Sequence, residues 1–340
     1  MASSEQRFGP SKTAHARLTA WLSCALLAVA ALSLLAGRYP SPGLIAPWSI
    51  SRDGMAKNIL LYFRLPRVLA AVLLGMSLGA SGMVFQTVFS NPLVEPGFLG
   101  VSQGAAFGAG MAIVFFGSGR WLVQGVAFIF ALSGLALSHA IARRVRFGGW
   151  ILRLVLAGIS VSALFSAGIG MLKYVADPLH QLPEITFWLL GGLWGVTWNQ
   201  LFTVLPVSAA SLAVIGSYRW RLNLLALGDE TAHSLGVSPA KERMLLLACA
   251  VASTAVMISV CGVVGWIGLI VPHMARRWLG ANTRVSLPGA MIIGSLFTLV
   301  CDDCARIALP GEIPLGILTS MVGAVLFLVL LVTGETRVRE

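Results

Sequence analysis

The sequence Cys301-Asp302-Asp303-Cys304 places two thiols and two carboxyls in one short stretch. Thiolates and carboxylates are metal ligands, so this stretch could bind a transition-metal ion. Asp302 and Arg306, however, are four residues apart, a spacing that brings two side chains together on one helix face. We therefore favour a charge pair near the end of a membrane helix over a metal site.

A second candidate is the imidazole of His273, in the stretch Val271-Pro272-His273-Met274-Ala275-Arg276. A histidine inside a membrane could relay protons. Proline, in turn, leaves helix backbone groups without partners, and neighbouring polar side chains can satisfy them. The sequence favours this role, in which His273 stabilises a break in a short helix.

The sequence lacks several motifs that would indicate catalysis within this chain. It contains no Walker A loop, no His-Glu-x-x-His and no Gly-x-Ser-x-Gly. The chain is therefore not expected to be an enzyme. If ATP powers a process in which it takes part, the nucleotide must bind to another chain.

The composition is that of an integral membrane protein. Of 340 residues, 57% are hydrophobic and 11% are charged, against roughly 25% charged residues in soluble domains. The net charge of +11 does not indicate nucleic-acid binding, because the basic residues form short clusters between apolar runs, as membrane orientation requires. The five cysteines lie in or beside apolar runs, where they behave as small hydrophobic residues rather than a disulfide framework.

The elements that must position these residues are apolar runs without a charged side chain. A bilayer-spanning helix needs about 20 such residues. The runs are 18–37, 68–94, 96–119, 121–142, 154–172, 185–218, 244–275, 285–301 and 313–334.

Basic clusters between the runs predict the orientation. The clusters around residues 143–153, 219–243, 276–284 and 337–339, with the N-terminus, are assigned to the cytoplasm. Run 244–275 then has both ends inside and must cross twice, turning near 261–265. Run 185–218 crosses once, at about 198–217, after a short non-crossing helix at about 185–195.

The predicted fold is therefore an all-α polytopic membrane protein of about ten transmembrane helices. Residues 18–334 form one transmembrane domain, and 1–17 and 335–340 are cytoplasmic tails. Two short or interrupted segments, 96–107 and 265–274, stand at comparable places in the two halves, a pattern typical of inverted repeats. Glycines at 75, 79 and 82 predict a helix whose backbone another helix approaches closely.

Two further stretches indicate partner surfaces. Arg64, Arg67 and Arg306 fall on the outer side in this topology, where they could extend toward lipid headgroups or form a docking surface for an acidic partner. The cytoplasmic segment 227–237 has acidic residues at a helix start and glycine at its end, which predicts a short helix. Such a helix is marginal alone, so we expect it to pack against a partner.

The sequence resembles the FecCD permease family, the membrane subunits of type II ABC importers for iron-siderophores, haem and cobalamin. The resemblance covers about residues 58–333 and includes Trp188-Leu189-Leu190-Gly191-Gly192. The other motifs that carry it are Arg64-Leu65-Pro66-Arg67, Asn91-Pro92-Leu93-x-x-Pro96-x-x-Leu99-Gly100, Leu227-Gly228-x-x-x-Ala232-x-x-Leu235-Gly236, Gly265-x-Ile267-Gly268 with Pro272-His273-x-x-Arg276, Asp302-x-x-x-Arg306, and Glu312-x-Pro314.

The resemblance implies an assembly around this chain. Its expected partners are a second copy of the permease, two cytoplasmic ATP-binding subunits and a soluble substrate-binding protein, with membrane lipid around it. ATP and Mg²⁺ would bind to the ATPase partner, and no cofactor to this chain. The location implied is the bacterial inner membrane.

The resemblance also implies roles for particular residues. Arg64, Arg67 and Arg306 would receive carboxylates of the binding protein. Helices 154–172, 185–195 and 313–334 would line the pathway. The ATPase would seat on a coupling helix at 228–237, where small Ala232 permits close approach and apolar Leu235 anchors it; the coupling residues are Gly228, Asp229, Glu230, Ala232, Leu235 and Gly236.

The cargo expected from the resemblance is a metal chelate. A ferric siderophore is the leading interpretation, and haem, cobalamin and molybdate are the alternatives. Polar residues in 154–176 suit an anionic or oxygen-rich molecule without choosing among these. A proton-coupled secondary transporter is the rival class, but the carboxylates inside predicted spans, Asp302 and Asp303, lie near a helix end. A membrane enzyme would need a cluster of reactive groups that the sequence does not show.

Overall fold

The computed structural model describes residues 12–39, 43–45, 53–309 and 311–332. The remaining residues, which include most of the predicted tails 1–17 and 335–340, lie outside the described part. The elements are α1 Lys12–Leu35, β1 Ala36–Gly37, β2 Gly43–Leu44, α3 Gly54–Asn58, η1 Ile59–Arg64, α4 Leu65–Val88, η2 Pro96–Leu99, α5 Val101–Phe115, α6 Arg120–Arg144, α7 Trp150–Val175, α8 Gln181–Leu190, α9 Trp198–Ser217, α10 Arg219–Leu225, α11 Asp229–Ser234, α12 Pro239–Cys261, α13 Ile267–Leu279, α14 Thr283–Ile307 and α15 Leu315–Val332.

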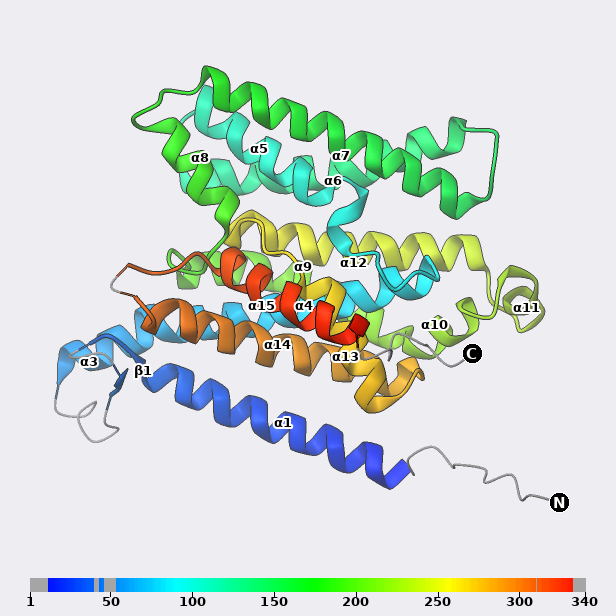
Figure 1. The fold of residues 1–340 in the computed structure, drawn as a ribbon, viewed down its shortest axis with the longest axis horizontal. Coiled ribbons are helices and arrows are strands. Elements are labelled where there is room, and N and C mark those ends of the chain that lie inside the picture. The colour runs from blue at the N-terminus through cyan, green and yellow to red at the C-terminus, as the bar shows by residue number, and fades with distance from the viewer. Residues whose placement is uncertain (1–11, 40–42, 46–52, 310, 333–340) are drawn as a thin grey trace.

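The described chain is a helical membrane protein, as predicted. By length and composition, seven of its helices are long and apolar enough to cross a membrane: α1, the continuous stretch from α3 to α4, and α6, α7, α9, α12 and α14. The shorter helices α5, α13 and α15 run beside them (Figure 1). Together these correspond to the segments predicted to span the bilayer.

The charge-based division of the long runs is confirmed. Run 244–275 separates into α12 and α13, with a break at 262–266, and α9 coincides with the expected crossing 198–217. The short helix before it, α8, begins four residues earlier than predicted, at Gln181 rather than 185. The sequence did not indicate α10 or the small hairpin in which Ala36 pairs with Leu44.

The second span begins well before its charge-free run. Helical structure starts after Asp53, whose side chain caps the helix by accepting a hydrogen bond from the backbone N–H of Met55 at 2.8 Å. The helix then continues through a π-helical turn, η1, to Val88. Arg64 and Arg67 therefore lie within a helix, where other helices can surround them.

Helices α4 and α14 form the centre of the fold, and their glycines meet as predicted. A Cβ on Gly75 would lie 2.3 Å from the backbone oxygen of Gly294, and one on Gly79 would lie 2.4 Å from that of Ala290. Gly82 faces α13 instead, with the oxygen of Gly268 2.0 Å from such a Cβ. Small residues allow this backbone approach, which larger side chains would prevent.

The helices run between two ends of the molecule (Figure 1). One end carries the beginning of α1 together with α10 and α11, and the opposite end carries α3, β1 and α8. Helix α12 runs toward the α8 end, and α13 returns toward the α10 end after the break. The chain therefore reverses between them, as the two-crossing interpretation requires.

Candidate functional site

The first break in the helical fold follows α4. Ser90 has a positive φ of 48°, and the side chain of Asn91 accepts a hydrogen bond from the backbone N–H of Leu93 at 2.9 Å. The chain then forms the single turn η2, and Gly100, with φ of 80°, leads into α5. The connection between α4 and α5 is therefore a non-helical turn, formed by the motif residues Asn91, Pro92, Pro96 and Gly100.

The second break separates α12 from α13. Gly262 has a φ of 67° and Trp266 a φ of 71°, an uncommon value for a large side chain. The ring of Trp266 lies 6.2 Å from that of Phe327 on α15, in an edge-on contact. Packing against α15 therefore holds the strained residue at the point where α13 begins.

The two breaks meet each other. A Cβ on Gly268, at the start of α13, would lie 2.6 Å from the Pro96 side chain. The Glu95 carboxylate accepts a hydrogen bond from the backbone N–H of Trp266, at the N-terminal end of α13. The first N–H groups of a helix lack partners within it, so this carboxyl group supplies an acceptor for one of them.

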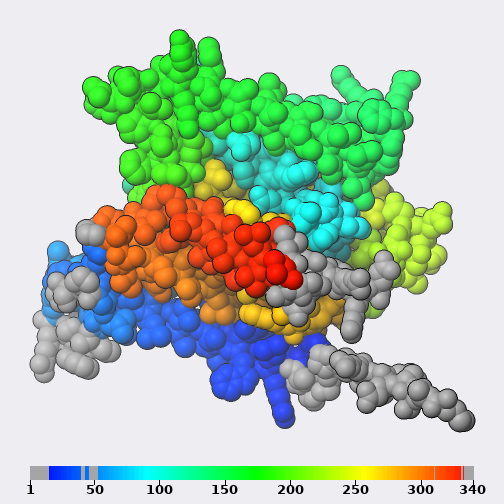
Figure 2. Space-filling model, viewed as in Figure 1, coloured from blue at the N-terminus to red at the C-terminus, as the bar shows by residue number. Residues whose placement is uncertain are grey.

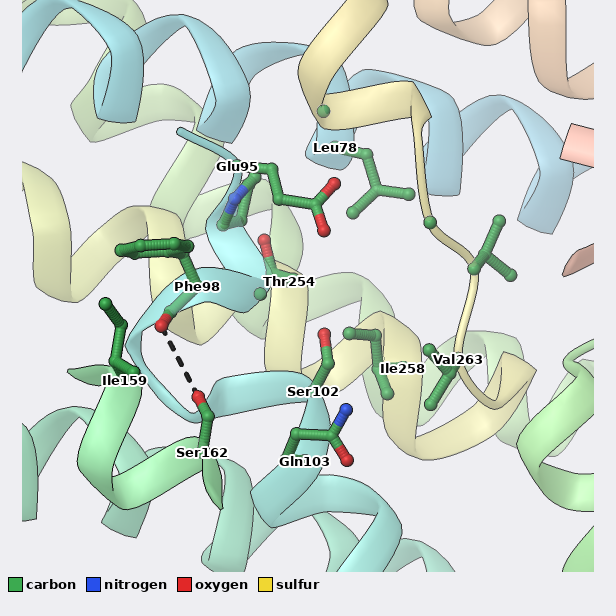
Figure 3. Close-up of a pocket in the computed structure, with 15 residues that line it drawn as sticks. Leu78, Glu95, Phe98, Ser102, Gln103, Ile159, Ser162, Thr254, Ile258 and Val263 are labelled. Atoms are coloured by element: carbon green, nitrogen blue, oxygen red, sulfur yellow. Dashed lines mark hydrogen bonds between the residues drawn. The ribbon is translucent and has the colours of Figure 1, made fainter. Parts of the chain in front are cut away.

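Glu95 also borders a cavity of about 290 Å³ between α4, α5, α7 and α12 (Figure 3). Its carboxylate and the hydroxyl groups of Ser102 and Thr254 point toward the same space. Thr254 is 1% exposed, and its hydroxyl has no hydrogen-bond partner among the described residues. A buried polar atom without a partner is costly, so this cavity suits water or an oxygen-rich guest.

A second cavity, of about 460 Å³, lies on the other side of the break 262–266. It shares Glu95, Val263 and Gly265 with the first cavity, and its other walls come from α8 and α15. Figure 2 shows this face of the molecule, with α7 and α8 (green) on one side, α15 (red) on the other, and α5 (cyan) visible between them. The two breaks therefore form the floor of a groove walled by α7, α8 and α15.

The elements that the resemblance assigned to a pathway all contribute to this groove. Ile159 and Ser162 come from α7, Leu190 from α8, and Ile317 and Ser320 from α15. Of the polar residues noted in 154–176, Ser162 lines the first cavity, where its hydroxyl group lies 3.5 Å from the Phe98 carbonyl oxygen.

Helix α13 is fastened to α4 by a polar contact that sequence reasoning did not identify. The Arg276 guanidinium donates to the side-chain oxygen of Gln86, whose amide in turn donates to the Leu269 backbone oxygen at 2.9 Å. His273 Nδ1 lies 3.4 Å from the same oxygen. Helix α13 continues through Pro272 without a break, and the carbonyl that this proline leaves free belongs to Gly268, which faces α4. The prediction that His273 bonds the groups freed by a proline break is therefore wrong, because His273 contacts Leu269 instead.

The arginines predicted to dock a partner are buried in this structure. Arg67 contacts Asp302 through two nitrogens, at 2.9 to 3.1 Å, and Glu312 at 2.8 to 2.9 Å. Arg306 lies 3.4 Å from Asp302, which confirms the predicted pair, and also contacts Asp303. These five side chains are called the outer ion cluster below.

Arg64 lies beside the outer ion cluster and donates to the backbone oxygens of Leu34 and Leu35, at 3.1 and 2.7 Å. Arg64, Arg67 and Arg306 are each less than 9% exposed. They therefore reach neither solvent nor headgroups freely, and whether they also bind a partner stays a prediction. Asp302 is fully buried and held by two arginines, which leaves its carboxylate unavailable to a metal ion.

The predicted cytoplasmic helix is present as α11. Gly228 and Gly236, with φ of 94° and 78°, flank it, and Asp229 pairs with Arg243 of α12 at 2.5 Å. Ala232 is 0% exposed, because it packs inside its own chain. Ala232 is therefore not accessible to a partner in this structure, whereas Leu235, at 54% exposure, is free to contact one, and the seating of a partner on this helix stays a prediction.

Sequence reasoning missed Glu95 and Thr254 as site residues. In the sequence Glu95 separates the charge-free runs 68–94 and 96–119, which places it in a connection between spans. A signal was present, since a carboxylate surrounded by apolar runs must find a partner or a polar cavity.

Comparison with known proteins agrees with this architecture. Residues 24–333 match the FecCD transport family. The chain is 37% identical over 318 residues to the molybdate import system permease protein MolB of Haemophilus influenzae, covering 91% of this chain and 93% of MolB. It is 42% identical over 288 residues to the hemin transport system permease protein HmuU of Yersinia pestis, covering 83% of this chain and 85% of HmuU.

A solved structure supports the same conclusion. It is a metal-chelate type ABC transporter in an inward-facing conformation, 36% identical to this chain, with a TM-score of 0.87 over 94% of this chain and 99% of the other. Family, sequence and fold thus agree over nearly the whole length. The chain belongs to the FecCD transport family, whose members named here are multi-pass permease subunits of importers.

Proposed function

We propose that this chain forms the translocation pathway of an ATP-driven importer for a metal chelate. The observation that carries the proposal is the groove floored by the two breaks, with Glu95 bordering a cavity on each side of residues 262–266. Membrane proteins place irregular backbone where it lines a cavity, because lipid cannot satisfy its polar groups. A groove of this kind in a transport-family protein is the natural place for a substrate to pass.

The groove is open along one face of the single chain, so a second subunit is needed to close it. A second copy placed on α7 and α15 would join two grooves into one central passage. Exposed apolar side chains on these helices, such as Leu164 at 67% and Val325 at 61%, suit burial against a partner or lipid. We therefore propose a homodimer with the passage between its subunits.

The proposed cargo is a ferric siderophore. The first cavity combines a carboxylate, hydroxyl groups and the amide of Gln103 with apolar walls, which suits an oxygen-rich molecule carrying apolar parts. Hemin and molybdate are named for relatives of this chain, and cobalamin for another. These remain the alternative cargoes.

The proposed assembly includes two cytoplasmic ATPases that bind ATP and Mg²⁺, and a soluble binding protein at the opposite face. The N-terminal end of α1 and helix α11 would lie in the cytoplasm of a bacterial inner membrane, following the basic clusters. Leu235 and the acidic residues Asp229 and Glu230 are the exposed groups that α11 offers to an ATPase. The outer ion cluster would face the binding protein.

Vesicles containing the chain with its co-purified partners test this function. Uptake of a radiolabelled ferric siderophore should require ATP inside the vesicles and persist when a protonophore removes the proton gradient. Molybdate, hemin and cobalamin in parallel assays identify the cargo. Uptake driven by a proton gradient in vesicles holding this chain alone would contradict the proposal and favour a secondary transporter.

The docking proposal needs a test that spares the outer ion cluster. Reversing Arg67 would leave Asp302 and Glu312 facing another carboxylate, so the variant would unfold for reasons unrelated to docking. Arg64 donates to backbone oxygens, and Arg64→Gln preserves a donor. A lower affinity for the binding protein in Arg64→Gln, with unchanged thermal stability, would support docking, whereas unchanged affinity would contradict a role for Arg64.

A further inference from the structure

A small basic cavity lies where α6 ends and α7 begins, far along both helices from α8 (Figure 1). It has a volume of about 130 Å³ and lies on the side of the fold that carries α10 and α11. Its walls come from three helices and are formed by His139, Ala142, Arg143, Trp150, Arg153, Leu154 and Met244. No acidic residue is among these lining residues, so the cavity combines an apolar floor with cationic side chains.

The cationic groups of this cavity are incompletely satisfied. Arg153 donates through Nη1 to the Val145 backbone oxygen at 3.1 Å, but its buried Nε has no hydrogen-bond partner among the described residues. Arg143 is exposed in the last turn of α6, and the structure shows no carboxylate paired with it among the described residues. The accessible guanidinium of Arg143 can therefore bind an anion that the chain itself does not supply.

The surroundings indicate a ligand that is charged at one end and apolar at the other. Ile141, Leu152 and Leu245, on the three helices that form the cavity, are each at least 40% exposed. Helices of this length and composition expose such side chains to acyl chains. Basic pockets between membrane helices near the cytoplasmic surface are suited to anionic headgroups.

We propose that this cavity binds the phosphate group of one anionic phospholipid, with Arg143 and Arg153 holding the phosphate oxygens. The acyl chains lie along the exposed apolar faces of α6, α7 and α12. A lipid fits better than free phosphate, because most of the cavity wall is apolar and continues into these faces. The inference is independent of which cargo passes through the groove.

The cavity is connected to α11 by a short series of contacts. The guanidinium of Arg243 lies 5.7 Å from the ring centre of Trp150, in the cavity wall, and the same side chain pairs with Asp229 of α11 at 2.5 Å. The ring of Phe89, at the end of α4, also packs against Trp150, with ring centres 6.0 Å apart. Lipid bound here would therefore buttress the residues that position α11.

Native mass spectrometry of the purified chain tests the site. With phosphatidylglycerol added, one lipid should remain bound at activation energies that remove phosphatidylcholine. Arg143→Gln with Arg153→Gln should weaken that adduct at least roughly tenfold, because two charge-assisted contacts to phosphate are lost. Arg144→Gln with Arg146→Gln is the matched control, since it removes the same charge from exposed neighbours that do not line the cavity.

Four outcomes would overturn the proposal. Equal loss in the control variant would mean diffuse attraction to a basic surface, and equal retention of phosphatidylcholine would mean no headgroup selectivity. Displacement of the lipid by millimolar inorganic phosphate would identify a free-anion site instead. If the double variant is poorly folded by circular dichroism, Arg143→Gln alone, at an exposed helix end, must still weaken the adduct several-fold, and an unchanged adduct would contradict the site.

Discussion

The α4–α14 seam and the junction of the two breaks both bring a glycine into close contact with another segment, but with opposite results. In the seam, Gly75 and Gly294 bring two regular helices together with no room for a Cβ, and Ser295 donates to backbone oxygens of both helices at 2.9 Å. At the junction, Gly268 meets Pro96 where helices are interrupted, and cavities remain on both sides of Glu95. The seam holds two helices in close contact, whereas the junction lines two cavities.

The largest expected effect comes from adding bulk to the seam. In Gly294→Leu the new side chain would collide with the backbone of α4, which cannot move as a flexible side chain would. Overpacking costs about 1–3 kcal/mol or more, so we expect loss of monodisperse protein in detergent and a large fall in melting temperature. Gly125→Leu, on an open face of α6, is the control and should retain both. A stable Gly294→Leu protein would contradict the close packing of the α4–α14 seam.

The next effect concerns the outer ion cluster at the end of the seam. Arg67→Met leaves Asp302 buried with a charge that only Arg306 can offset, and removing one partner of a buried pair typically costs about 3–5 kcal/mol. Glu312→Gln should cost much less, because its side chain is 39% exposed. Thermal unfolding of Arg67→Met, of Asp302→Asn and of the double variant measures the coupling between the two side chains. Additive losses in the double variant would contradict a direct interaction.

Helix α11 buries Ala232 against its own chain and is followed by Leu235, which is exposed. Ala232→Trp should now destabilise the chain itself, because Ala232 is enclosed by its own neighbours. Leu235→Ala should leave thermal stability within about 0.5 kcal/mol of the wild type, as exposed substitutions usually do, and lower ATP-dependent uptake. Equal stability of Ala232→Trp and the wild type would mean that α11 moves freely.

The smallest effect is at the start of α8, beside the groove. Asp177 accepts hydrogen bonds from the backbone and ring of His180 and from the backbone of Leu179, which lower the pKa of its carboxyl below the usual 3.8. A lowered pKa in the folded state contributes stability that is present above the unfolded pKa and is lost as the pH falls through the folded value. Between about pH 5 and pH 3, the melting temperature of Asp177→Asn should therefore fall less than that of the wild type. An unchanged profile would show that these hydrogen bonds do not persist in solution.

The sequence was sufficient where local spacing determines structure. Glycines at 75, 79 and 82 predicted a close helix contact, Asp302 and Arg306 predicted a pair, and basic clusters divided run 244–275 at the right place. Each inference depends on helix periodicity or on the side of the membrane, both of which are encoded within a short stretch.

The contacts that could not be predicted join residues far apart in the chain. Arg67 and Asp302 are separated by 235 positions, and no pattern within either segment selects the other. Ala232 reads as a small residue free to receive a partner, and its burial depends on how α10 and α12 fold around it. Glu95 reads as part of a connection, and it becomes a site residue because the second break folds against the first.

The most direct test of the central claim, that the junction rather than the seam lines the passage, compares thiol access in the two regions. In a variant whose five native cysteines are replaced, Ser102→Cys lies in the first cavity and Ser295→Cys in the seam. In the assembled transporter, a water-soluble thiol reagent should modify Ser102→Cys at a rate that changes with ATP and falls with cargo present, and should leave Ser295→Cys unmodified. Modification of Ser295→Cys at a comparable rate, or a Ser102→Cys that stays unreactive in every state, would contradict the account.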